Sequence, residues 1–324
     1  MQQEVATDCG GRAHVTVWPD NAWEVNFHLP LPSFEPHLAG LQNLVGICRE
    51  TRHRVKFFFV SSIGTAGNWP TGLLGPVPET AIRNLESPIN GYGASKLVAE
   101  HLLSRAAQSG ILNLSVLRVG QVAGPIRSDE SGGEWTRRDW LPAIIDASVY
   151  IKALPADLGS ANTLDWIPVD LLADVTTELL HTDRHTEPNE TFYNLLNPRT
   201  SSWQDIVPHI QARLTTTLSD VVHIVSFKDW IDLLRNAEDK ITLDMGIATN
   251  GTLAGAKNAE AGLKLLSFFE SLASVVTDTG LLESGTGRQV RWATNNATLQ
   301  SSTFAEMTPV STAWFDRWLD QWGY

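Results

Sequence analysis

"VKFFFVSS", residues 55–62, is an apolar run of strand length that ends in two serines. A run of this kind, without alternating polar residues, is typical of a strand buried on both faces of a parallel sheet. Just before it, "PHLAGLQNLVGICRE" (Pro36 to Glu50) has apolar residues at helical spacing. The sequence therefore predicts a helix that leads into a buried parallel strand.

Strand and helix patterns alternate on both sides of this run. The short β-rich run "HVTVW" (His14 to Trp18) lies upstream, and "LNLSVLRVG" (Leu112 to Gly120) and "TFYNLLN" (Thr191 to Asn197) lie downstream. Helical segments follow Tyr92 and cover "LLADVTTELL". Alternation of this type over about 200 residues predicts an α/β fold with a largely parallel, doubly wound sheet.

Beyond Pro198 the sequence becomes mostly helical. The segments "SWQDIVPHIQARL" and "AGLKLLSFFESLASVV" flank a stretch rich in Gly, Ala and Asn at residues 249–262, which we expect to be a loop. The final "AWFDRWLDQWGY" places Trp314, Trp318 and Trp322 at successive helical turns. We expect this stripe to be the packed face of a terminal helix and not a platform for ligand stacking.

Composition limits the classes of function. The 324-residue chain carries a formal net charge of -12, which argues against a nucleic-acid partner. No apolar run approaches the roughly 18 residues that a membrane span needs. The two cysteines, Cys9 and Cys48, are too few for a disulfide framework, and the nine histidines show no ligand spacing, so we expect no metal. Because the amino terminus lacks a secretory pattern, we expect a cytoplasmic protein.

"GYGASKLVAE", residues 91–100, places Tyr92 and Lys96 four residues apart, which is one face of a helix. A lysine ammonium near a tyrosine phenol stabilises the phenolate and lowers the pKa of the phenol, which is ordinarily about 10. Such a tyrosine can exchange a proton with a carbonyl or alcohol oxygen. The two residues are therefore a candidate catalytic pair, and the alternative is that they only share a helix face.

Ser61 and Ser62 stand at the carboxyl end of the predicted strand. In an open α/β sheet, ligands bind outside the carboxyl ends of the strands. A serine hydroxyl at that edge can hydrogen-bond a substrate carbonyl as negative charge develops on its oxygen. We expect Ser62 to act in this way, whereas the alternative is that both serines only terminate the strand.

Three of these segments, "FVSSIG", "GYGASK" and "VLRVGQVAGP", resemble motifs of the extended short-chain dehydrogenase/reductase superfamily. The resemblance implies that Ser62, Tyr92 and Lys96 form the catalytic set. It also implies that the lysine holds the nicotinamide ribose and that the loop at residues 119–121 lies beside the nicotinamide. The implied cofactor-binding residues are Asn21, Ser61, Tyr92, Lys96, Val119, Gly120 and Gln121. For Asn21, in "DNAW", a turn asparagine is an equally good interpretation.

A narrower resemblance covers most of the chain. "NAWEVNFHLPLPSFEPHLAGLQNL", "DWIPVDLLAD" and "TPVSTAWFDRWLDQWGY" resemble the carboxy-terminal thioester reductase domain of fungal NRPS-like adenylate-forming reductases, relatives of the carboxylic acid and aminoadipate reductases. The resemblance implies a partner, a carrier domain whose phosphopantetheine bears an acyl thioester. It further implies hydride transfer from NADPH to the acyl carbon, which gives an aldehyde and, in some members, an alcohol for secondary metabolism.

The sequence departs from this family at its beginning. The superfamily opens with a strand, a Gly-x-x-Gly-x-x-Gly turn and a helix that hold the cofactor pyrophosphate, and "DCGGRAHV" lacks that spacing. We therefore expect an N-terminally truncated Rossmann-type, doubly wound parallel sheet with a mostly helical C-terminal substrate lobe. Residues 1–126 and 161–198 would form the incomplete NAD(P)-binding domain, and residues 127–160 and 199–324 the substrate or carrier lobe.

Two other functions fit parts of the pattern. One is a truncated, catalytically impaired remnant or a carrier-binding module without the cofactor phosphate site. The other, which the closing tryptophan-rich segment disfavours, is another extended short-chain oxidoreductase or an epimerase.

Four charged residues outside the candidate pair have less specific interpretations. Asp165 and Asp170 are expected to cap helices or to lie at a sheet edge, with Asp170 as an N-cap. Arg137 and Arg138 are expected to be a solvated charge pair, although a phosphopantetheine phosphate is an alternative ligand for them.

Overall fold

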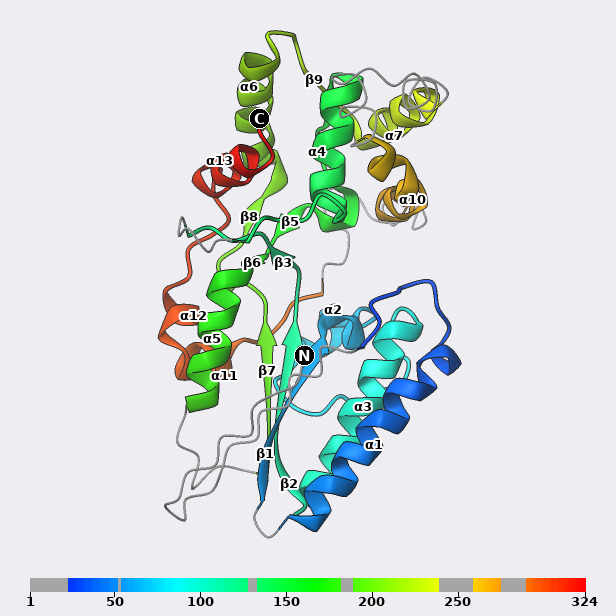
Figure 1. Cartoon of the computed structure of the whole chain (residues 1–324), viewed down its shortest axis with the longest axis vertical. Coiled ribbons are helices and arrows are strands. Elements are labelled where there is room, and N and C mark those ends of the chain that lie inside the picture. The colour runs from blue at the N-terminus through cyan, green and yellow to red at the C-terminus, as the bar shows by residue number, and fades with distance from the viewer. Residues whose placement is uncertain (1–22, 52–53, 128–132, 182–188, 239–258, 275–289) are drawn as a thin grey trace. The chain divides into compact units, whose positions relative to one another are not determined.

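The structure is a computed structural model that describes residues 23–51, 54–127, 133–181, 189–238, 259–274 and 290–324 (Figure 1). The chain divides into two compact units. The first unit comprises Met1–Gln121, Val175–Leu196 and Val290–Glu306, and the second comprises Val122–Asp174, Asn197–Gln289 and Met307–Tyr324. The predicted strand at His14 to Trp18, the "DCGGRAHV" segment and Asn21 lie outside the described residues.

A parallel sheet forms the centre of the first unit, as the α/β pattern predicts. Its strands are β1 (Val55–Ser62), β2 (Leu112–Val119) and β7 (Glu190–Leu195), in the order β1-β2-β7. Ser62 is opposite Val119, and Val119 is opposite Leu195. The three strands therefore end at the same edge of the sheet.

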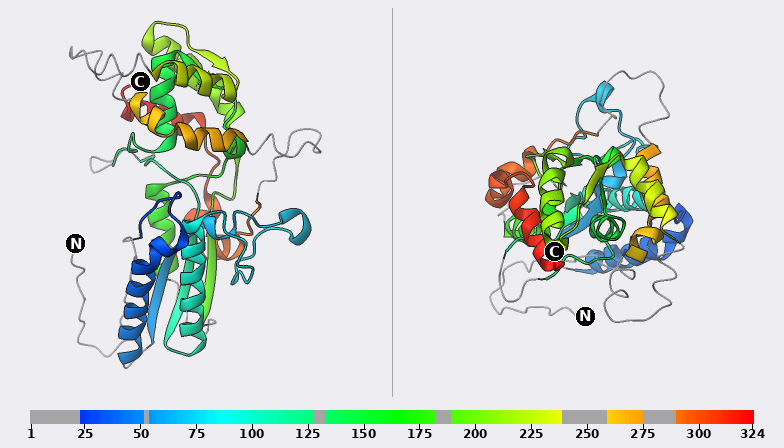
Figure 2. Two further views of the ribbon diagram at one scale, coloured as in Figure 1. Left: turned by 90° about the vertical axis from the view of Figure 1, so that its right-hand side faces the viewer. Right: turned by 90° about the horizontal axis from the view of Figure 1, so that it is seen from above.

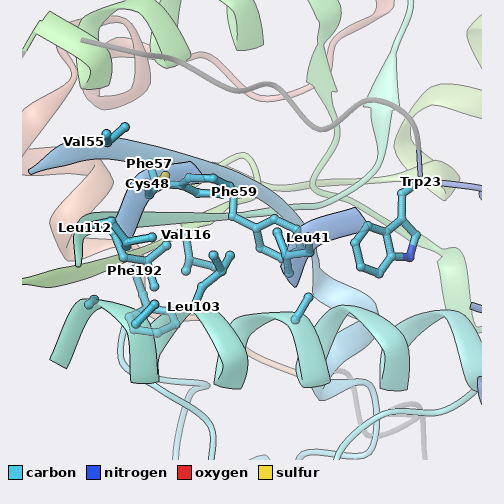
Figure 3. Close-up of a cluster of buried hydrophobic side chains, with 14 of the residues drawn as sticks. Trp23, Leu41, Cys48, Val55, Phe57, Phe59, Leu103, Leu112, Val116 and Phe192 are labelled. Atoms are coloured by element: carbon cyan, nitrogen blue, oxygen red, sulfur yellow. The ribbon is translucent and has the colours of Figure 1, made fainter. Parts of the chain in front are cut away.

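Two long helices, α1 (Glu35–Glu50) and α3 (Gly91–Gln108), run side by side along the sheet (Figures 1 and 2). Phe57 and Phe59 of β1 pack with Leu41 of α1 and Leu103 of α3 in one buried cluster (Figure 3). Every second residue of the strand points to this cluster. The predicted helix at residues 36–50 and strand at residues 55–62 are confirmed.

Shorter elements complete the first unit. The 3-10 helices η1 (Leu31–Phe34) and η2 (Ile63–Ala66) and the short helix α2 (Thr71–Leu74) lie between the long elements. On the β7 side of the sheet, away from α1 and α3, are α5 (Val169–His181), of which the residues from Val175 onward belong to this unit, α11 (Asn295–Gln300) and α12 (Ser302–Glu306) (Figure 1). Val175 and Leu179 of α5 are fully buried.

The second unit is mostly helical. Its helices are α4 (Trp140–Ile151), α6 (Trp203–Leu218), α7 (Phe227–Asn236), α10 (Leu266–Ser274), α13 (Thr312–Gln321) and the 3-10 helix η3 (Gly159–Ala161). Its two-residue or three-residue strands pair as β3 (Val122–Ala123) with β6 (Ile167–Pro168), β4 (Ala153–Pro155) with β9 (His223–Val225), and β5 (Thr163–Leu164) with β8 (Ser201–Ser202). Trp314, Trp318 and Trp322 are all buried, which confirms the predicted packed stripe.

The predicted N-cap role of Asp170 is wrong. Helix α5 begins at Val169, so Asp170 lies within its first turn. One oxygen of its carboxylate, Oδ2, accepts hydrogen bonds from the backbone N–H groups of Ile126 and Arg127, at 3.2 and 2.9 Å. The carboxylate therefore bonds amides of a segment remote in sequence, besides the N–H of Leu171 in its own helix, which donates to Oδ1 at 3.1 Å.

The solvated charge pair expected at Arg137 and Arg138 is also wrong for Arg137. Arg137 Nη1 lies 2.5 Å from Oδ1 of Asp146, a buried residue of α4, and its guanidinium also donates to the carbonyl of Trp322. Arg138 is exposed, as expected. The two arginines therefore have different roles in the second unit.

Candidate active site

Tyr92 and Lys96 lie in the first two turns of α3. The helix begins at Gly91, and Oδ1 of Asn90 caps it by accepting from the Gly93 N–H at 2.8 Å. Because the two residues are one helical turn apart, they share a face of the helix. Tyr92 is 8% exposed and Lys96 3% exposed, so the protein holds both side chains in defined positions.

Ser62 is the last residue of β1, beside the amino end of α3. Its hydroxyl accepts from the Gly64 N–H at 3.1 Å and so caps the short helix η2. Burial raises the pKa of Tyr92, and a hydrogen bond with the Ser62 side chain lowers it; burial is the larger effect, so the pKa lies above its usual value. The lowered pKa expected from the neighbouring Lys96 is therefore wrong, because burial outweighs it, and the phenol is kept protonated, as a proton donor must be.

The ammonium group of Lys96 is held by one carbonyl and by aromatic rings. Nζ donates to the carbonyl of Val60 at 2.8 Å. It also lies 4.3 Å from the ring centroid of Trp23 and 4.9 Å from that of Phe59, within range of cation–π attraction. The distance from Nζ to the centre of the Tyr92 ring is 6.0 Å. The charge therefore stands near the phenol, as the spacing predicts.

The glycines on each side of Tyr92 are required by close contact between backbones. A Cβ atom on Gly93 would lie 2.2 Å from the carbonyl oxygen of Gly64, and one on Gly91 would lie 2.2 Å from that of Leu29. Real Cβ atoms do not approach so closely. The serine-bearing segment and the tyrosine-bearing helix thus touch main chain to main chain.

Three residues around Tyr92 were not singled out from the sequence. Trp23 Nε1 donates to the Ser95 hydroxyl at 3.0 Å, and that hydroxyl donates to the carbonyl of Tyr92 at 2.7 Å. The ring of Phe27, which is 52% exposed, meets the Tyr92 ring edge-on at a centroid distance of 5.4 Å. Trp23 and Phe27 both belong to "NAWEVNF", a segment whose aromatic residues are a signal for such contacts.

The predicted nicotinamide loop begins at the same edge of the sheet. Val119 is paired with Ser62, and the Gly120 N–H donates to the carbonyl of Leu195 at 3.0 Å. A Cβ atom on Gly120 would lie 3.0 Å from Cγ of Leu196, so a side chain there would crowd β7. Gln121 follows directly. The structure thus brings the start of this loop next to the serine end of β1.

Ser61 faces a different environment from Ser62. Its hydroxyl donates to Oε1 of Glu100 on α3 at 2.6 Å, and Glu100 forms an ion pair with Arg118 of β2. Ser61 therefore has its hydroxyl engaged behind the sheet edge, and its cofactor-binding role stays a prediction. Sequence analysis missed Glu100 and Arg118, although an arginine inside the apolar strand "LNLSVLRVG" is itself a signal, because a buried guanidinium needs an acidic partner.

Comparison with known proteins shows the family of the chain. The sequence profile of the NAD-binding family described as "Male sterility protein" matches residues 12–176. The chain belongs to this family, a branch of the extended short-chain dehydrogenases/reductases. Its domain resembles the terminal thioester reductase domains of adenylate-forming reductases and of NRPS and PKS systems.

Particular relatives support this assignment. A carboxylic acid reductase of Neurospora crassa is 34% identical over 232 residues, which is 70% of this chain and 21% of that protein. An adenylate-forming reductase of Heterobasidion annosum is 29% identical over 315 residues, which is 96% of this chain and 26% of that protein. The chain thus spans about a quarter of the length of these two relatives.

Solved structures share the fold. The terminal R domain from the myxalamid PKS-NRPS biosynthetic pathway aligns with a TM-score of 0.64 at 19% identity, over 93% of this chain and 66% of that one. The R domain of a non-ribosomal peptide synthetase from Mycobacterium tuberculosis aligns with a TM-score of 0.56 at 16% identity, over 90% and 66%. At this identity the likeness establishes the α/β architecture alone.

Metal-binding clusters and membrane-spanning helices are both absent from the described residues. Within the described ranges no group of three or more His, Cys, Asp and Glu side chains is arranged to hold a metal ion. No helix in the described part of the chain has the length and apolar character to cross a bilayer.

Proposed function

We propose that this chain reduces an acyl thioester, carried on the phosphopantetheine of a carrier domain, to an aldehyde with NADPH as the hydride donor. The observation that supports this most is the convergence of Ser62, Tyr92 and Lys96 at the carboxyl edge of a parallel sheet, in a chain of this reductase family. The proposal includes a role in secondary metabolism and a cytoplasmic location. The first unit would bind the cofactor, and the second would bind substrate or carrier.

The polar groups at this edge fit the nicotinamide and ribose end of the cofactor. A phenol, an ammonium group and a serine hydroxyl converge there, and Lys96 has donors suited to ribose hydroxyls. When bound, NADPH supplies the hydride that the acyl carbon accepts. Ser62 would donate a hydrogen bond to the thioester oxygen, and Tyr92 would give that oxygen its proton as negative charge develops.

Lys96 would assist this proton transfer electrostatically. Its ammonium stabilises the phenolate that Tyr92 becomes after it donates its proton. The hemithioacetal left on the substrate then breaks its C–S bond, which releases the carrier thiol and the aldehyde. A second hydride transfer to the aldehyde, again with Tyr92 as the acid, would give an alcohol.

The proposal is tested with the purified chain and a separate acylated carrier domain. We expect saturable NADPH binding by fluorescence titration, NADPH consumption that depends on the acyl carrier, and an aldehyde trapped as its hydrazone. Tyr92→Phe should lower kcat by about 100-fold or more, because the proton donor is lost. As a matched control, Tyr150→Phe removes a phenol from α4 and should leave kcat unchanged. No NADPH binding below millimolar concentration would contradict the proposal.

A further inference from the structure

A buried ion pair lies behind the candidate site. Glu100 of α3 and Arg118 of β2 are 2% and 0% exposed. Arg118 Nε lies 3.0 Å from Glu100 Oε1, and Arg118 Nη2 lies 2.8 Å from Oε2, so the contact has two points. This geometry fixes the direction of both side chains, because a planar guanidinium fits a carboxylate in one orientation.

The Glu100 carboxylate joins the segments that carry the candidate site. The Ser61 hydroxyl donates to it at 2.6 Å, and Ser61 immediately precedes Ser62. Glu100 itself lies one helical turn after Lys96, on the same face of α3. Glu100 therefore lies on the helix that carries Tyr92 and Lys96, and it is hydrogen-bonded to the residue that precedes Ser62 in β1.

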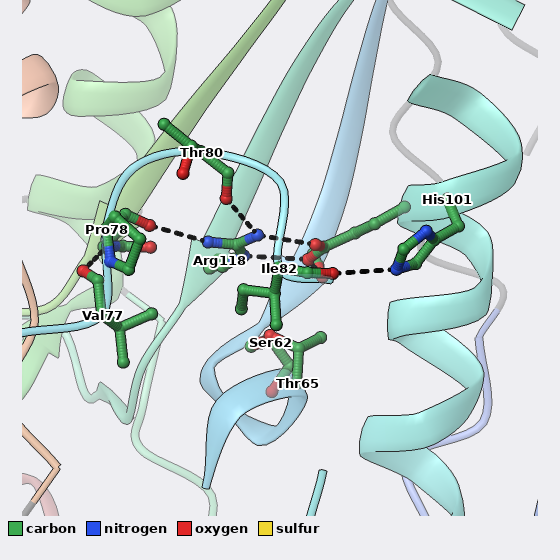
Figure 4. A network of polar contacts seen from close by, with 11 residues as sticks. Ser62, Thr65, Val77, Pro78, Thr80, Ile82, His101 and Arg118 are labelled. Carbon is green, nitrogen blue, oxygen red and sulfur yellow. Dashed lines mark hydrogen bonds and ion pairs between the residues drawn. The ribbon is translucent and has the colours of Figure 1, made fainter. Parts of the chain in front are cut away.

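Arg118 extends the same network to a loop. Nη1 donates to the carbonyl of Pro78 at 3.2 Å, and Nη2 donates to the carbonyl of Thr80 at 2.9 Å (Figure 4). The guanidinium carbon also lies 4.8 Å from the ring centroid of Phe192 on β7. The cation is thus held from several sides and keeps Glu100 in place.

We propose that Glu100, held by Arg118, is a positioning residue that acts through Ser61 to fix Ser62 relative to Tyr92 and Lys96. The inference rests on the proposed function, since it concerns the same reaction. The desolvation of a buried ion pair offsets much of its attraction, so its net contribution to stability is often small. Its fixed geometry matters more here, because displacement of a reacting group by about 1 Å can lower a rate about 100-fold.

The Ser61–Glu100 hydrogen bond can be removed without breaking the ion pair. Ser61→Ala deletes only the hydroxyl and leaves Glu100 bonded to Arg118. Ser104→Ala is a matched control, because Ser104 lies on α3 one turn after Glu100 and is buried, and its hydroxyl has no partner among the described residues. Ser61→Thr retains the hydroxyl and serves as the rescue variant.

Two measurements distinguish positioning from a general structural role. The first is kcat and KM for the acyl carrier at saturating NADPH, where we expect Ser61→Ala to lower kcat about tenfold with the KM for the carrier unchanged. The second is the pKa of Tyr92, followed by NMR of carbon-13-labelled tyrosine in the free chain and assigned with Tyr92→Phe. Loss of the Ser62 hydrogen bond should raise this pKa in Ser61→Ala. The side chains of Phe27 and Phe34 that pack on Tyr92 carry no charge, and Lys96 is retained in every variant.

The proposal is supported if Ser61→Ala changes both kcat and the Tyr92 pKa, Ser104→Ala changes neither, and Ser61→Thr brings both back toward their wild-type values. It is overturned if either quantity stays at its wild-type value in Ser61→Ala, if Ser104→Ala changes them equally, or if Ser61→Thr restores neither. If the wild-type chain has no turnover, the proposed function fails. The Tyr92 pKa then decides the positioning inference alone: a rise confined to Ser61→Ala supports it, and the absence of a rise overturns it.

Discussion

Each unit of the molecule contains a buried carboxylate bonded to an arginine, and the two pairs differ in how completely they are satisfied. In the first unit, both oxygens of Glu100 accept from Arg118, and one also accepts from Ser61. In the second unit, Oδ1 of Asp146 accepts from Arg137, whereas its buried Oδ2 has no hydrogen-bond partner in the described part of the chain.

The arginine of the fully bonded pair is also the more deeply buried of the two. Arg118 is fully buried, whereas the Arg137 side chain is 30% exposed. Asp146 also accepts from the Tyr324 hydroxyl at 2.5 Å, and burial, the larger effect, still raises its pKa despite these two partners. Glu100, with both oxygens bonded, fixes the geometry of its neighbours. Asp146, with one oxygen unbonded, is less stable in its ionised form, and its pKa is raised.

The largest effect is expected when the fully bonded pair is broken. Arg118→Met should lower the free energy of unfolding by about 3–5 kcal/mol in urea denaturation, because Glu100 is left as a buried charge without its partner. The double variant Glu100→Gln, Arg118→Met removes both charges and should recover much of that loss. A loss below about 1 kcal/mol in the single variant would show that Glu100 is not held as a buried anion.

A smaller effect is expected when the half-bonded pair is broken. Arg137→Met should lower the free energy of unfolding by about 1–2 kcal/mol near neutral pH, because Asp146 keeps the Tyr324 hydroxyl and can take up a proton. Removal of the arginine raises the pKa of Asp146 further. The loss should therefore be larger near pH 8 than near pH 5, and equal losses at both pH values would contradict this account.

Asp165 is a third acid with a raised pKa, and no arginine is bonded to it among the described residues. Burial raises the pKa of Asp165 to about 6, and the only opposing contribution is a hydrogen bond from its own backbone amide. The folded state therefore binds this proton more tightly than the unfolded state. Its stabilising contribution is complete below the ordinary pKa of 3.8 and is lost as pH rises through about 6.

Asp165→Asn should remove that pH dependence. Near pH 7.5 the variant should be more stable than wild type by about 1–3 kcal/mol, because one pKa unit corresponds to about 1.4 kcal/mol, and near pH 3.5 the two should be equal. The measurement is urea denaturation at intermediate pH steps. A variant less stable than wild type at pH 7.5 would show that the ionised carboxylate has a favourable partner.

The smallest effect is expected at Arg138, the exposed neighbour of Arg137. Arg138→Ala should change the free energy of unfolding by less than about 0.5 kcal/mol, as is usual for surface substitutions. It therefore serves as the control for Arg137→Met. Weaker binding of an acyl carrier to Arg138→Ala, by surface plasmon resonance, would instead favour the phosphate interpretation of this residue.

The sequence predicts best those features that are set by local pattern. The strand at residues 55–62 and the helix at residues 36–50 could be predicted because burial on both faces, or on one helical face, leaves a regular spacing of apolar residues. The closeness of Tyr92 and Lys96 follows from the helical repeat alone. The site is therefore predictable where one helix or one strand end carries it.

Features that depend on distant partners could not be predicted from local pattern. Asp170 is of a residue type that often caps helices, yet besides the Leu171 N–H its carboxylate accepts from two amides 44 and 43 positions earlier in the chain. Arg137 resembles a surface charge, but it bonds Trp322, 185 positions away. The apolar strand around Arg118 indicates that this residue has an acidic partner, but not that the partner is Glu100, 18 positions earlier on another element. In each case the polar partner is brought close only by the fold.

The contact between the backbones of Gly93 and Gly64 has a consequence for redesign. Because this contact is formed by backbone atoms, no side-chain rotamer can change the distance between the segment after Ser62 and helix α3. Any side chain at Gly93 would have to part these two segments, because its Cβ atom would lie 2.2 Å from the carbonyl oxygen of Gly64.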